Sequence, residues 1–219
     1  MAKFLPLLGS LSGSIGDNTF SNNKGGPYVR RRSNPTNPTS ARQTAARAIL
    51  ATVSAAWAAQ TSGNRQAWAD YAALNPFTDP LGTTFQLSGQ QMFCALNARL
   101  LQAGTTIVST PPIASTLAAF TTLTPTLTAP ATISIVHAAT PLGAAERMQL
   151  WMCLPSTAGR DPNFKQARLV GYSAAANASP AAFTSPFPFA TGQVVNLWVA
   201  KMDGAGRTTP VQKLRVTVP

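Results

Sequence analysis

Few residues in this sequence could support catalysis or bind a metal ion. There is one histidine, His137, and it alternates with Ile133 and Ile135, which predicts a packed or partly exposed strand residue. The acidic residues are scattered singly, without the spacing that would place two carboxylates on one helix face or strand end for general acid–base chemistry. We expect them to be solvated or to cap turns. They are Asp17, Asp70, Asp79, Glu146, Asp161 and Asp203.

The two cysteines, Cys94 and Cys153, are too few for a disulfide scaffold or a zinc cluster. They fall in different predicted domains, so we expect free thiols. No G-x-S-x-G motif is present, and "GSLSGSIG" lacks the G-K-[ST] ending of a phosphate-binding loop. We therefore expect no enzymatic activity, no cofactor and no metal site.

The positive charge of the chain is concentrated near its N-terminus. The net charge is +11, although only 11% of residues are charged. Residues 1–47 hold seven basic side chains against one acidic side chain, Asp17. This distribution predicts an anionic partner for the N-terminal part. The candidate docking residues are Lys24, Tyr28, Arg30, Arg31, Arg32 and Arg42.

Acidic protein and nucleic acid are both possible partners for this basic segment. Arg30–Arg32 could contact phosphates, and Tyr28 could stack on a base. The run has only three arginines, however, and basic arms have about five to eight. Arg42 and Arg47 lie five residues apart on a predicted helix, so they point about 140° away from each other. We therefore favour acidic protein, and we keep nucleic acid and a merely solvated arm without a partner as the alternatives.

Residues 1–38 form a predicted extended arm. "SIGDNTFS" and "PYVRRRS" flank a five-residue turn, "NNKGG", which predicts a β-hairpin. Alternation would place Tyr28, Arg30 and Arg32 on one face, and Val29 and Arg31 on the other. Such a ribbon has little apolar surface and would be marginal alone. The two following Asn-Pro pairs favour an extended or turn conformation.

The residue pattern of 39–104 predicts a unit of three helices. The first helix covers residues 41–60, with Ser40 or Thr39 as its cap and "TSGN" after it, and the second covers 65–74. Ser88 caps the third, with Gln91 at the capping-box position and Gly104 at the C-terminal cap. Ala45 and Ala56 complete the apolar stripe of the first helix, and we expect the tryptophans to form the core between the first two helices. The predicted core is Ile49, Val53, Trp57, Trp68, Tyr71, Phe93, Leu96 and Leu100.

After a Pro/Thr-rich linker, 105–118, the hydrophobic period changes to two and predicts an all-β domain over 119–219. The proline-containing "TSPFPF" is a further, edge-strand candidate. The final stretch, "VVNLWVAKMDGAGRTTPVQKLRVTV", resembles the closing strands of fibronectin type III and related immunoglobulin-like domains, which implies a sandwich used for display or adhesion. The fold class is therefore α+β and multidomain. The predicted strands are 131–138, 147–154, 167–173, 193–201 and 211–218.

No apolar run approaches the roughly 20 residues that a membrane span needs. "MAKFLPLLGSLSGS" faintly resembles a signal peptide, but Pro6 and Gly9 interrupt its short apolar stretch. We expect no membrane partner and no secretion signal.

A longer pattern covers about residues 11–104. "LSGSIGDNTFSNNKGGPYVRRRSNPTNPTSARQTAAR", "AAWAAQTSGNRQAWADYA" and "GTTFQLSGQQMFCALNARLLQAG" resemble a family of uncharacterised proteins of tailed bacteriophages and prophages. That resemblance implies a virion structural protein, made in the bacterial host cytoplasm. A capsid decoration or cement protein fits the composition best. Its expected partners are the major capsid protein or other virion proteins. We also expect a homo-oligomer or symmetry-related copies in the assembly. A tail, fibre or adaptor component is the main alternative.

Overall fold

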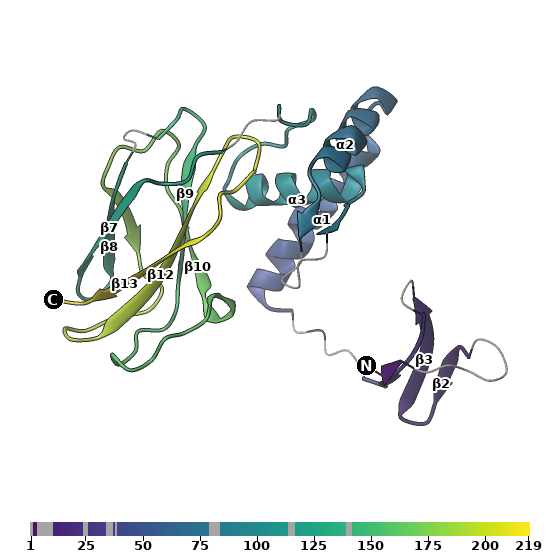
Figure 1. Ribbon diagram of the computed structural model, residues 1–219, viewed down its shortest axis with the longest axis horizontal. Coiled ribbons are helices and arrows are strands. Elements are labelled where there is room, and N and C mark those ends of the chain that lie inside the picture. Colours follow the sequence, from purple (N-terminus) through teal and green to yellow (C-terminus); the bar gives the residue numbers. More distant parts are fainter. Residues whose placement is uncertain are drawn as a thin grey trace. The chain divides into compact units, whose positions relative to one another are not determined.

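The computed structural model describes residues 2–3, 11–23, 26–33, 37, 39–78, 84–113, 117–138 and 142–219. The chain divides into two compact units, Met1–Ala45 and Ala46–Pro219. It combines three α-helices with antiparallel β-sheets, so the α+β class is confirmed (Figure 1). The boundary between the units lies inside the first helix, and the other helices share a unit with the C-terminal strands. The predicted four-part domain division stays a prediction.

A four-stranded antiparallel sheet forms the first unit. The predicted hairpin between its two longest strands is confirmed, but the predicted five-residue turn is wrong. Asn22 pairs with Pro27, and Asn23 pairs with Gly26, so only residues 24–25 connect the strands. The order is β1-β4-β3-β2. The strands are β1 (Ala2–Lys3), β2 (Gly13–Ile15), β3 (Asn18–Asn23) and β4 (Gly26–Arg31). Lys24, most of the Asn-Pro segment and Asp79 lie outside the described residues.

The helices begin at hydrogen-bonded caps. Ser40 Oγ accepts a hydrogen bond from the Gln43 backbone N–H at 3.4 Å, as expected for the first helix. The capping box of Ser88 and Gln91 is confirmed, with hydrogen bonds of 2.9 and 3.2 Å. "TSGN" was wrongly placed, because Thr61 caps the second helix and the next three residues form its first turn. The helices are α1 (Ala41–Ala58), α2 (Ser62–Leu74) and α3 (Gly89–Gln102).

The helical core centres on one aromatic side chain of α3. The rings of Trp57 and Trp68 each lie 5.3 Å from the ring of Phe93. The tryptophans therefore meet on α3 rather than only between α1 and α2. Six of the predicted core residues are buried, Ile49 and Trp57 are half-buried, and Ala45 is exposed, contrary to its predicted place on the apolar stripe. The buried ones are Val53, Trp68, Tyr71, Phe93, Leu96 and Leu100.

Two antiparallel sheets in the C-terminal region enclose a second core (Figure 1). One has the order β10-β9-β12-β13 and the other β11-β8-β7. All five predicted strands are present, but two strands were missed. Pro125 lies inside β7, and "TSPFPF" is not a strand because β11 ends at Thr184. The strands are β7 (Thr122–Thr128), β8 (Thr132–Ala138), β9 (Arg147–Met152), β10 (Arg168–Tyr172), β11 (Ala181–Thr184), β12 (Val194–Met202) and β13 (Gln212–Thr217).

Smaller elements complete the described chain. A two-stranded ladder, β5 (Phe77–Thr78) with β6 (Thr84–Phe85), follows α2, and η1 (Phe164–Gln166) is a short 3-10 helix. Among the described residues, no helix is both long enough and apolar enough to cross a membrane.

Candidate functional site

The basic segment lies on β4 and directly after it. Arg30, Arg31 and Arg32 are exposed, whereas Tyr28 and Val29 are half-buried. Opposite Arg30 and Arg31 on β3 are the uncharged residues Thr19 and Asn18. The Arg32 backbone N–H donates to the Asp17 carbonyl oxygen, which ties the end of β4 to the β2–β3 turn. Among the described residues, none of the three guanidinium groups forms an ion pair.

The described side chains of the sheet that carries these arginines form no buried core. No side chain that the structure describes between residues 11 and 33 is buried, and all three residues of β2 are exposed. A sheet of this size normally gains its stability from a buried apolar face. The described side chains therefore give the basic strand no fully buried apolar face.

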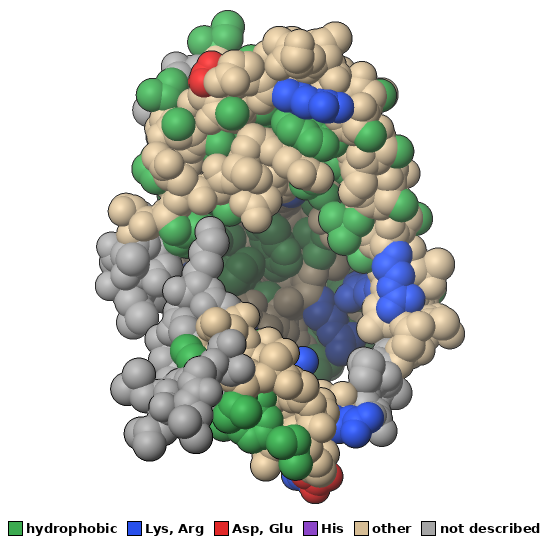
Figure 2. All heavy atoms as spheres, turned by 90° about the vertical axis from the view of Figure 1, so that its right-hand side faces the viewer, with side chains coloured by type: hydrophobic (Ala, Val, Ile, Leu, Met, Phe, Trp, Pro, Cys, Tyr) green, Lys and Arg blue, Asp and Glu red, His purple; other side chains and the backbone are tan. Residues whose placement is uncertain are grey.

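Arg42 is the last of the predicted docking residues. It lies exposed in the first turn of α1, where no acidic side chain is present. The N-terminus of a helix carries partial positive charge, so a basic residue is unfavourable there and an acidic group nearby would be stabilising. Figure 2 shows that acidic side chains are sparse on the face it presents. Among the described residues, no acidic side chain forms an ion pair with Arg42.

The other titratable side chains have structural roles. Glu146 forms an ion pair with Lys201 at 3.2 Å, and Asp203 forms one with Arg207 at 2.7 Å. Asp161 pairs with Lys213, whose hydrogen bond lowers the pKa of that carboxyl group. Among the residues the structure describes, no three His, Cys, Asp or Glu side chains gather as a metal-binding group.

His137 and the cysteines are also placed by packing. The imidazole of His137 is 2% exposed, and its ring lies 5.8 Å from the ring of Phe120, so the predicted packed position is confirmed. Cys94 and Cys153 are both free, as expected. Burial raises the pKa of both thiols, which disfavours the thiolate that a nucleophilic cysteine needs.

The sequence did not predict that α3 packs against the sandwich. A Cβ atom on Gly206, in the β12–β13 loop, would lie 2.4 Å from the Leu96 carbonyl oxygen. One turn further along α3, Arg99 Nη1 donates to the Gly206 carbonyl oxygen at 3.3 Å. Tyr172 Oη donates to Gln102 Oε1 at 3.2 Å. No local pattern of residues in α3 or in this loop indicated the contact.

The predicted linker is also held in place. The Asn97 side chain is fully buried, donates to the Val108 carbonyl oxygen at 3.2 Å and accepts from the Val108 N–H at 2.7 Å. Trp68 Nε1 donates to the Ser109 carbonyl oxygen at 2.8 Å. The first part of the predicted linker is therefore packed on α2 and α3.

Comparisons with known protein families, with curated proteins and with solved structures gave no match. The functional argument therefore rests on the residues of this chain. Of these, the exposed arginines, on a sheet whose described side chains are not buried, form the clearest candidate for a docking site.

Proposed function

We propose that the protein is a non-enzymatic structural component of a tailed-phage particle, most specifically a capsid decoration or cement protein. In this proposal β4 and the residues after it dock on an acidic surface of another virion protein. The observation that carries the proposal is the set of exposed, unpaired arginines on a sheet with no buried side chains among those described.

A partner protein could cover the half-buried side chains and the open edge of this sheet. Association can bury Tyr28 and Val29, which are only half-buried in the free chain. The short edge strand β1 pairs only with Tyr28 and Val29, so the described residues leave the β4 edge at Arg30 and Arg31 open. An exposed edge of this kind can accept a strand from a partner. Docking would thus combine backbone hydrogen bonds with charge pairing.

The arginines favour acidic protein over nucleic acid. Successive strand residues point to opposite faces, so Arg30 and Arg31 cannot both face one phosphate backbone from a flat ribbon. Guanidinium groups bind carboxylates through paired hydrogen bonds, which suits acidic side chains on two sides of an inserted strand. Tyr28 is the one aromatic residue on this strand, and base stacking along a single strand uses several.

The sandwich supports the display role. If β7 to β13 are the seven successive strands of the domain, the first, second and fifth form one sheet and the remaining four form the other. The fourth strand, β10, lies beside the third rather than in the first sheet, as in fibronectin type III domains. This order supports the immunoglobulin-like likeness, which implies a module for contacts rather than catalysis.

Removal of the arm tests the proposal. We expect a chain lacking residues 1–38 to fold, because the buried clusters that the structure describes are formed by residues from 53 onward. It should no longer join particles in a reassembly assay followed by sedimentation. Incorporation of the truncated chain at the level of the full chain would refute docking through the arm.

Substitution of the arginines tests the role of charge. The triple change Arg30→Ser, Arg31→Ser and Arg32→Ser should abolish particle association, whereas the matched triple change to Lys should retain part of it. In parallel, the unmodified protein should show little sequence-independent DNA binding in a mobility-shift assay at about 0.15 M salt. Micromolar or tighter DNA binding would instead favour the nucleic-acid alternative.

A tail, fibre or adaptor component is the second candidate, because arms and immunoglobulin-like modules serve there too. The copy number per purified particle, measured by quantitative mass spectrometry, separates the two. Hundreds of copies indicate the capsid, and a number near three, six or twelve indicates the tail or a vertex.

A further inference from the structure

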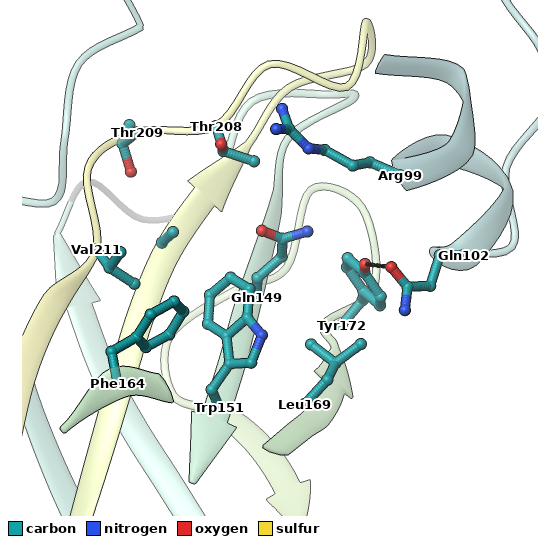
Figure 3. A pocket seen from close by; sticks show the side chains of 11 residues that line it. Arg99, Gln102, Gln149, Trp151, Phe164, Leu169, Tyr172, Thr208, Thr209 and Val211 are labelled. Carbon is teal, nitrogen blue, oxygen red and sulfur yellow. Dashed lines mark hydrogen bonds between the residues drawn. The ribbon is translucent and has the colours of Figure 1, made fainter. Parts of the chain in front are cut away.

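A solvent-open cavity of about 300 Å³ lies between the C-terminal half of α3 and the outer face of the sheet β10-β9-β12-β13. Figure 3 shows Arg99 and Gln102 reaching into it from α3, above side chains of the sheet. Trp151 and Phe164 form an aromatic wall, with their ring centroids 5.6 Å apart in an edge-to-face arrangement. Phe164 is 39% exposed and Val211 is 43% exposed, so the rim is accessible to a ligand.

We propose that this cavity binds a carboxylate group, held by the Arg99 guanidinium, with an apolar portion of the ligand against Trp151 and Phe164. The proposal is independent of the docking role of the N-terminal sheet. It assigns a second contact site to the protein, within the unit Ala46–Pro219.

The guanidinium of Arg99 is short of partners. Among the described residues it donates to one acceptor, the Gly206 carbonyl oxygen at 3.3 Å, and to no carboxylate. The neighbouring Arg207 differs, because Asp203 already neutralises it at 2.7 Å. Burial lowers the pKa of Arg99, which reflects a charge that is partly removed from water without a counter-ion. Such a group gains most from an anionic hydrogen-bond acceptor.

The remaining polar groups restrict which anion fits. Gln149, 3% exposed, lies on β9 below Arg99 (Figure 3). Its amide donates to the weak acceptor Met202 Sδ at 3.6 Å, and its side chain also hydrogen-bonds with Tyr172. The Tyr172 hydroxyl donates to Gln102 and is held at the side of the cavity. One unneutralised positive charge, one amide and one phenol suit a single carboxylate better than a phosphate, which is normally held by several charges. The volume lies at the small end of the range for ligand sites, so a side chain or a small acid fits.

The carboxylate could come from a free small acid or from an Asp or Glu side chain of a partner protein. We would titrate the full-length protein at pH 7 with phenylacetate, with its uncharged analogue phenylacetamide, and with a blocked peptide containing Glu next to Phe. Binding would be followed by ¹H–¹⁵N NMR through the Trp151 indole and Arg99 Nε–H signals. At least one of the two acids should shift both signals and bind roughly tenfold to a hundredfold more tightly than phenylacetamide, the usual gain from a charge-assisted hydrogen bond.

Three variants make the test specific. Arg99→Gln should remove the preference for the acid over the amide, and Arg168→Gln, the same change at an exposed arginine on β10, should leave it intact. If Arg99→Gln unfolds, Val211→Trp at the exposed rim should instead block binding without disturbing the core. Binding of the peptide alone would assign the site to a partner side chain, and binding of phenylacetate would assign it to small acids. If neither acid binds, or if acid and amide bind equally, the proposal is wrong.

Discussion

Gly206 is the position at which the contact between α3 and the sandwich can be tested most directly. Its φ is +80°, in the region that L side chains rarely adopt. An added Cβ would also lie 2.4 Å from the Leu96 carbonyl oxygen and 3.3 Å from Leu100 Cγ. Gly206→Ala therefore combines backbone strain with a collision against the backbone of α3, which cannot rotate away as a flexible side chain could.

The backbone strain and the collision together should remove a large fraction of a typical free energy of unfolding. A left-handed conformation costs a non-glycine residue about 1–2 kcal/mol. Forcing an extra methyl group into packed surroundings costs about 1–3 kcal/mol more. We therefore expect Gly206→Ala to lower the free energy of unfolding by about 2–5 kcal/mol, against a typical total of about 5–15 kcal/mol.

Gly192→Ala is the matched control. Gly192 has a φ of +83°, but an added Cβ there would meet no atom within 4 Å. It should therefore show the backbone cost of about 1–2 kcal/mol without the collision. Urea unfolding followed by tryptophan fluorescence measures both, and the melting temperature should fall about 2–4 °C per kcal/mol in a chain of this size. If Gly206→Ala costs no more than Gly192→Ala, the close approach of the β12–β13 loop to α3 is refuted.

Three further predictions concern buried polar and titratable groups. Asn97→Ala removes the side-chain hydrogen bonds to Val108 and to the Phe93 carbonyl oxygen and should cost about 1–3 kcal/mol in urea unfolding. Asn97→Asp should cost at least as much, because it places a carboxylate against two carbonyl oxygens at a fully buried position. Equal stability of Asn97→Ala and the unmodified chain would show that Asn97 does not hold the predicted linker in place. Burial raises the pKa of Tyr71 and Tyr172 above 10.0, so their contribution to stability should be complete below pH 10 and fall as the pH rises through the raised values. Tyr172→Phe should therefore reduce the loss of unfolding free energy at high pH. An unchanged slope of stability against pH would argue against a raised pKa for Tyr172. Cys153 is 3% exposed and burial raises its thiol pKa. In a Cys94→Ser variant, Cys153 should therefore react slowly with a thiol reagent at pH 8 until urea unfolds the chain. Rapid labelling of the folded chain would show that the thiol is accessible.

Local signals in the sequence predicted most of the secondary structure. The capping box of Ser88 and Gln91 fixed the start of α3, because both hydrogen bonds lie within four residues. Alternation predicted β8, β9 and β12, which contribute alternate residues such as Ile133, Leu150 and Leu197 to one core. Prediction failed where the local signal was ambiguous. Pro125 argued against β7, yet β7 is an edge strand, where a missing N–H is tolerated.

The candidate docking site was predictable only as a set of residues. The concentration of arginines and the hairpin that carries them follow from composition and turn chemistry. The small apolar surface of the hairpin also follows from its residues. Which of its side chains are buried does not, because burial depends on what the rest of the chain covers.

The sequence by itself determined the helices and most strands, and it located the positive charge in the N-terminal part, since these depend on neighbours within a few residues. Only the tertiary structure decided that α3 rests on the sandwich, that Asn97 holds the predicted linker, and that Arg99 faces a cavity in which no described residue is its counter-ion. Each of these joins groups 11 to 107 residues apart along the chain. Contacts at such separations depend on how elements pack, and no local pattern of residue types records that packing.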